Sequence, residues 1–281
     1  MDGLLDIFRA AGLDFVAQVA TLFGALGLVA LLLHLVERRI SRRLAHRFGW
    51  RSVLVTGWLG VPLHELSHLV ACLVFRHRVV AFSLFDPDPR TGTLGYVQHS
   101  YRKRSPYQLA GSFFIGVAPL VGGALVLFGA LWALLPSALP AYGAPLGADI
   151  GAQLAHTAAQ AGVTLGGIFT LEHAGSLAFW AFLLIALCVG SHLSPSRPDL
   201  QGAWPGLLLL LGALFALNLT NRAFGLTSPG AVSSLAASVL APLLALLALA
   251  LCLQLLLWLA VELLVWLTTP RRGLSLGYEE G

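Results

Sequence analysis

Charged residues are scarce in this chain. Only 11% of its 281 residues are Asp, Glu, Lys or Arg, and Lys103 is the only lysine among the 17 basic residues. A soluble globular domain carries about twice this charged fraction. The basic residues are also not interleaved with aromatic ones as on a nucleic-acid-binding surface. The composition therefore excludes an ordinary soluble enzyme and argues against a nucleic acid as a partner.

Cysteines and long polar segments are also rare. Cys72, Cys188 and Cys252 all lie in apolar segments and form no CxxC pair, which argues against a disulfide framework and indicates small core residues. The longest polar interval, residues 76–107, spans only about thirty residues, fewer than an independent domain needs. We therefore expect a single domain, residues 1–281, with no appended soluble module.

Apolar residues make up 57% of the chain, and the mean hydropathy is +0.82. They form long unbroken runs, which predict an all-α polytopic membrane protein with about six transmembrane helices embedded in the lipid bilayer. The predicted spans cover residues 15–36, 53–75, 108–135, 176–193, 204–219 and 235–268.

The location and orientation follow from composition and charge. Six crossings would leave both termini on one side, and a small excess of basic residues there predicts that this side is cytoplasmic. The Arg-rich connection after the first span opposes this orientation. The richness in Ala, Leu, Gly and Arg is typical of a GC-rich bacterial genome, so the predicted location is a bacterial inner membrane. The sequence carries no signal for an oligomeric state.

The connection between the second and third predicted spans contains a hairpin pattern. Residues 79–85 and 93–99 have the composition of strands, and the Pro- and Gly-containing stretch between them has turn chemistry. We expect a small β-hairpin whose edge can receive an extended peptide as an added strand; an ordinary polar loop is the alternative. Farther along, residues 148–161 predict a short interfacial helix.

The second predicted span contains His64-Glu65-Leu66-Ser67-His68. Imidazoles and carboxylates are costly in lipid and usually persist there for a function. On a helix, His64 and His68 lie one turn apart on the same face and can bind one Zn²⁺. Glu65 can reach a metal-bound water as a general base. The alternative is a polar helix-packing cluster that binds no metal.

A catalytic zinc site usually takes three protein ligands, so a third must come from elsewhere in the chain. The best candidate is Asp199, in a short polar break with two prolines between two apolar spans. Such non-helical backbone is tolerated at membrane depth where it lines a wet cavity. His192, in the same break, is the second candidate. Asp199 could instead cap the following helix or pair with Arg197. The weaker candidates are Glu172, His173 and Glu262.

These features together resemble the site-2 protease family, the M50-type intramembrane zinc metalloproteases. The resemblance covers about residues 53–204, where His64, Glu65 and His68 match the family's HExxH motif and Asp199 matches its aspartate ligand. That aspartate usually precedes a glycine, whereas here Leu200 follows. The resemblance implies a zinc-dependent endopeptidase that cleaves a membrane-embedded protein, with its site near the cytoplasmic face. The alternative function is a non-proteolytic, zinc-binding or metal-free membrane scaffold or chaperone.

Overall fold

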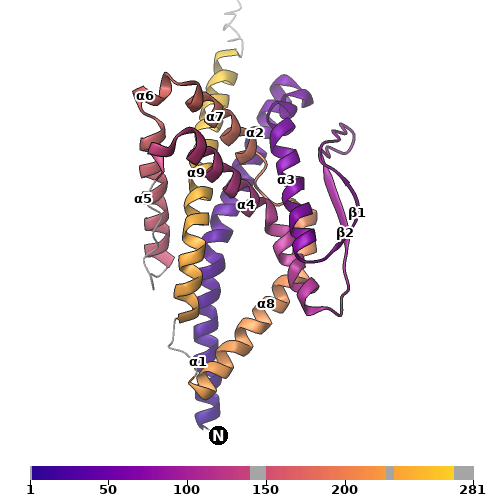
Figure 1. Ribbon diagram of the computed structural model, residues 1–281, viewed down its shortest axis with the longest axis vertical. Coiled ribbons are helices and arrows are strands. Elements are labelled where there is room, and N and C mark those ends of the chain that lie inside the picture. Colours follow the sequence, from indigo (N-terminus) through magenta and orange to yellow (C-terminus); the bar gives the residue numbers. More distant parts are fainter. Residues whose placement is uncertain (1, 140–149, 226–230, 269–281) are drawn as a thin grey trace, which may run out of the picture.

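The computed structural model describes residues 2–139, 150–225 and 231–268, and this part of the chain is mostly helical (Figure 1). The helices and strands are α1 (Asp2–Val19), α2 (Ala25–Phe48), α3 (Leu54–Val74), β1 (Arg78–Ser83), β2 (Tyr96–Ser100), α4 (Pro106–Leu134), α5 (Ile150–Ile168), α6 (Leu171–Ala174), α7 (Leu177–Gly190), α8 (Arg197–Phe224) and α9 (Ala231–Thr268). A π-helical segment, Ala20–Gly24, joins α1 to α2, so the two form one continuous helical rod.

Five segments within the described residues are long and apolar enough to cross a membrane, judged by length and composition. They are Leu4–Phe48, Trp50–Val74, Pro106–Leu134, Arg197–Phe224 and Leu240–Thr268. They coincide with five of the six predicted spans. The predicted fourth span corresponds to α7, which has only 14 residues. At 1.5 Å per residue it is about 21 Å long, shorter than the ~30 Å hydrocarbon core, so it is not counted as a crossing on its own.

The two ends of the described chain lie far apart. The N-terminus is at the bottom of Figure 1, whereas α9 ends at the top. The end of α2 lies beside the end of α9, where Arg47 Nη2 donates to Thr268 O over 2.6 Å. The predicted placement of both termini on one side assumed six crossings, so it does not extend to this arrangement with five candidate spans.

The predicted hairpin is present. Strands β1 and β2 pair antiparallel, with Val79 opposite His99 and Phe82 opposite Val97, and a bulge interrupts the register between Val79 and Ala81. Both strands are shorter than the sequence pattern predicted. The hairpin packs beside α3 (Figure 1). The predicted interfacial helix corresponds to α5, which is longer than expected and packs against α9; residues 148–149 of the predicted range lie outside the described part.

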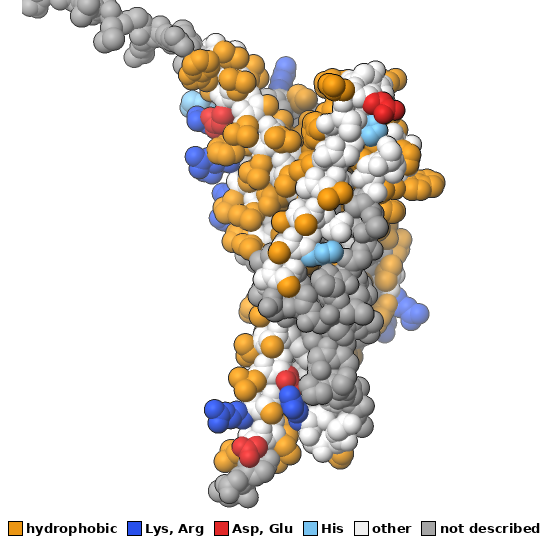
Figure 2. Space-filling view, turned by 90° about the vertical axis from the view of Figure 1, so that its left-hand side faces the viewer, with side chains coloured by type: hydrophobic (Ala, Val, Ile, Leu, Met, Phe, Trp, Pro, Cys, Tyr) orange, Lys and Arg blue, Asp and Glu red, His pale blue; other side chains and the backbone are white. Residues whose placement is uncertain are grey.

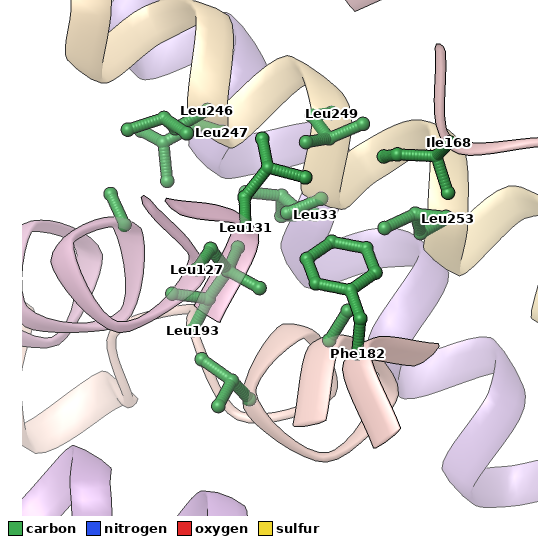
Figure 3. Packing of buried hydrophobic residues seen from close by; sticks show 14 of the residues in the cluster. Leu33, Leu127, Leu131, Ile168, Phe182, Leu193, Leu246, Leu247, Leu249 and Leu253 are labelled. Carbon is green, nitrogen blue, oxygen red and sulfur yellow. The ribbon is translucent and has the colours of Figure 1, made fainter. Parts of the chain in front are cut away.

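The buried core lies between α2, α4, α7 and α9 (Figure 3). Leu33, Leu127 and Phe182 are fully buried there. The short helix α7 is therefore held from several sides, and the polar segment that follows it begins at a fixed place. Leu193, in that segment, fits against α4 because Gly123 has no side chain; a Cβ there would lie 1.9 Å from Leu193 Cδ2.

The outer surface is mostly apolar. Figure 2 shows hydrophobic side chains along the length of the visible face, with most of the charged ones near its upper and lower ends. Large exposed hydrophobic residues include Leu125, Trp132 and Leu177, which are 64%, 65% and 85% exposed. This distribution suits a lipid environment better than water.

Candidate metal centre

Helix α3 carries the first two ligand candidates. His64 and His68 are one helical turn apart, and their Nε2 atoms lie 3.2 Å from each other. Pro62 lies inside the same helix, just before His64. A proline there lacks the N–H that would bond to the preceding turn, so it loosens the backbone next to the site.

Backbone carbonyls select the neutral tautomer of both rings. His64 Nδ1 donates to His192 O over 2.7 Å, and His68 Nδ1 donates to Ile115 O over 2.8 Å. A carbonyl only accepts, so each neutral ring carries its proton on Nδ1 and has a bare Nε2. Two bare nitrogens that face each other at 3.2 Å have no proton to share. This arrangement is typical of imidazoles poised for a cation.

Asp199 completes the group from the first turn of α8. Its Oδ1 lies 3.4 Å from His68 Nε2, and its Oδ2 lies 3.6 Å from His64 Nε2. Asp199 also closes a capping box, in which Oδ2 accepts from Ser196 N over 2.7 Å while Ser196 Oγ accepts from Asp199 N. The helix-capping role and the position beside the histidines therefore coexist, because capping orients the carboxylate towards α3.

The three residues can share one metal ion. Their ligand atoms all lie within 4.8 Å of one another, and the group is mostly buried. Ligand atoms about 2.0–2.1 Å from one ion at tetrahedral angles lie about 3.3 Å apart. The separations of 3.2, 3.4 and 3.6 Å are close to this value. The donor set therefore fits a divalent cation without rearrangement of the backbone.

Helix α4 holds the two ligand-bearing helices against each other. It supplies the Ile115 carbonyl to His68, and the next residue, Gly116, lies against the first turn of α8. A Cβ on Gly116 would be 2.6 Å from Asp199 O and 2.6 Å from Ala203 Cβ. Only glycine lets α8 approach closely enough here, so Gly116 determines how near Asp199 comes to His68.

The other ligand candidates lie elsewhere or have different roles. His192, the second candidate, is not part of the metal group: its Nδ1 donates to Cys188 O over 3.2 Å, and its backbone carbonyl orients His64. Glu262 forms a bidentate ion pair with Arg43. His173, on α6 together with Glu172, binds the backbone of Gly167 and the hydroxyl of Ser137.

A cavity of about 940 Å³ adjoins the metal group. Glu65 lines it and is only 8% exposed. The segment before β2 also lines the cavity and packs against Glu65, since a Cβ on Gly95 would lie 2.9 Å from Glu65 Cγ. Glu65 therefore lies between the metal group and the hairpin, in a cavity large enough to hold a short peptide segment.

Sequence reasoning missed two residues on α2 that line the same cavity. Ser194 Oγ donates to Glu37 Oε2 over 2.5 Å and accepts from His34 Nδ1 over 3.2 Å. These contacts attach the segment between His192 and Asp199 to α2. The signal was present, since His34 and Glu37 are three residues apart at the end of an apolar run and thus share a helix face.

The chain was compared with known proteins. The comparison with protein-family models found no match, and neither the curated proteins nor the solved structures gave one.

Proposed function

We propose that this protein is a zinc-dependent intramembrane endopeptidase of the site-2 protease type. The observation that carries the proposal is the convergence of His64, His68 and Asp199 at metal-ligand distances, with Glu65 in the adjoining cavity. Two of these residues and Glu65 lie on a helix long and apolar enough to cross a membrane. A carboxylate next to a ligand is not needed for metal binding alone, so its presence favours catalysis.

Zinc is the metal we infer. Two imidazole nitrogens and one carboxylate are a ligand set used by catalytic zinc sites, which keep a fourth position for water or substrate. When bound, zinc polarises a scissile carbonyl and lowers the pKa of a water towards neutrality.

Glu65 acts as the general base in this proposal. It takes a proton from the attacking water and passes it to the leaving amine nitrogen, so that one carboxylate serves both halves of peptide hydrolysis. Its low exposure keeps bulk water from competing for that proton. The Nδ1 contacts of His64 and His68 keep both rings in orientation during the reaction.

The substrate we propose is a membrane-embedded protein. A helical peptide bond is shielded by its own backbone, so the substrate must unwind before attack. The hairpin next to the cavity offers strand edges to which an unwound segment can add. The proposed setting is a bacterial inner membrane, with the site towards the cytoplasmic face.

The test uses purified full-length protein in proteoliposomes with a model transmembrane peptide that contains helix-destabilising residues. We expect zinc-dependent cleavage, abolished by Glu65→Gln while the zinc content stays near one per chain. Glu172→Gln, a change on α6 outside the cavity, is the matched control and should leave cleavage intact. Continued cleavage by Glu65→Gln would reject the mechanism. Zinc binding without cleavage by the wild type would favour the scaffold or chaperone function instead.

A further inference from the structure

Two further histidines meet at the wall of the cavity. His77, just after α3, is 5% exposed, and its Nδ1 lies 3.0 Å from Nδ1 of His99 on β2. The Tyr101 ring stacks on His77, with centroids 4.8 Å apart and planes at 21°. His99 itself lines the cavity beside the metal group. Its ring is thus held in place by a buried neighbour rather than left to turn freely.

The donor and the acceptor in the His77–His99 hydrogen bond can be assigned from the other contacts of His77. His77 Nε2 lies 2.7 Å from Gln108 O, a carbonyl that can only accept, so this nitrogen carries a proton. No carboxylate contacts His77 among the described residues, so nothing compensates for burying a positive charge on it. Neutral His77 therefore has a bare Nδ1, which accepts a hydrogen bond from His99 Nδ1–H. The Nε2 atom of neutral His99 is consequently bare as well.

Because His99 Nδ1 bonds to His77, Nε2 is the ring nitrogen that can bind a molecule in the cavity. Among the described residues it has no hydrogen-bond partner, and His99 does not belong to the metal group. Burial lowers the pKa of His99 below its ordinary value. His99 is therefore neutral near pH 7, and its Nε2 is a hydrogen-bond acceptor. A carbonyl or an anion needs a donor, so neither can bind to this nitrogen.

We infer that His99 Nε2 accepts a hydrogen bond from a backbone N–H of an extended peptide in the cavity. This inference rests on the proposed function and adds a substrate-binding residue to it. An extended chain presents N–H groups along its length, and the nearby wall is itself a strand with its connecting loop. The acceptor on the hairpin and the ligands on α3 and α8 then hold the chain at two separate points, which fixes the position of the scissile bond.

The test uses zinc-loaded full-length protein in detergent and three probes. Acetohydroxamate binds the metal alone, an acyl-Leu-Leu hydroxamate adds backbone N–H groups, and N-methylated versions remove these groups one at a time. We expect methylation of one N–H to weaken binding to the wild type about five- to tenfold. The same methylation should leave binding to His99→Leu unchanged. His99→Gln, which keeps an acceptor, should restore part of the effect.

The controls separate the two hypotheses. His173→Leu removes a histidine outside the cavity and should behave as the wild type. If acetohydroxamate binds no variant, the proposed zinc site is wrong. If it binds all of them and every methylation effect is equal in wild type and His99→Leu, the inference about His99 is wrong. ¹⁵N NMR of labelled histidine should show the Nδ1–H tautomer at His99, and an Nε2–H tautomer would overturn the inference.

Discussion

Replacement of Ser194 by alanine should weaken zinc binding although Ser194 touches no ligand. Ser194 lies between His192, whose carbonyl orients His64, and Asp199, the third candidate ligand. It is 7% exposed, and its hydroxyl bonds to Glu37 and His34 on α2. Ser194→Ala detaches this segment from α2, so the carbonyl and the carboxylate lose a common anchor.

The magnitude follows from the contacts that are lost. A buried hydrogen bond to an ionisable group is worth about 1 to 3 kcal/mol, and about 1.4 kcal/mol corresponds to a tenfold change in affinity. Contacts outside the ligand shell usually change metal affinity by about 10–100-fold. Because Ser194 acts through the backbone of its segment, we expect the lower end, a roughly tenfold rise in the zinc Kd.

The assay is competition for zinc against a chromophoric chelator, together with the absorption spectrum of the Co²⁺-substituted protein. Ser191→Ala is the matched control, because Ser191 caps the end of α7 just before this segment and is about as buried as Ser194, but its hydroxyl donates to Leu187 of its own helix. Glu37→Gln keeps an acceptor for the Ser194 hydroxyl and should lose less affinity than Ser194→Ala. An unchanged zinc Kd and Co²⁺ spectrum in folded Ser194→Ala would refute the positioning argument.

Two further predictions concern the ligand set and the approach of α8. Asp199→Ala should lose zinc under conditions where His192→Ala retains most of it, because the His192 ring lies outside the metal group. Metal analysis of both purified variants checks this prediction. The opposite ranking of zinc contents would make His192 the third ligand. Gly116→Ala should lower both zinc affinity and thermal stability, because its methyl group would meet the Asp199 carbonyl. Gly129→Ala on the same helix is the control, since its methyl group would meet nothing within 4 Å and should leave stability unchanged or raise it by about 0.5–1 kcal/mol. Equal melting temperatures and equal zinc Kd values for the two variants would contradict the close approach of α8 at Gly116.

The apolar spans and the hairpin were predictable because their causes are local. Unbroken apolar runs predicted all five candidate spans, and strand-forming residues on either side of the Asp86–Gly92 turn predicted the β1–β2 pair. The length of α7 was not predictable in the same way. The predicted span, residues 176–193, ran on into the polar break at Ser191 and His192, whereas the helix ends at Gly190 and the chain enters the segment anchored by Leu193 and Ser194.

The sequence by itself determined the half of the site that depends on helix periodicity. His64 and His68 share a face because they are four residues apart, and Glu65 accompanies them. Only the tertiary structure decided between Asp199 and His192, because that choice depends on the capping box, the close approach at Gly116 and the carbonyl of His192. The same holds for His99, since a tautomer set by His77 and Gln108 arises only when the hairpin packs beside the start of α4. Spacing along one helix is a property of the chain, whereas contacts between distant segments depend on how the helices pack.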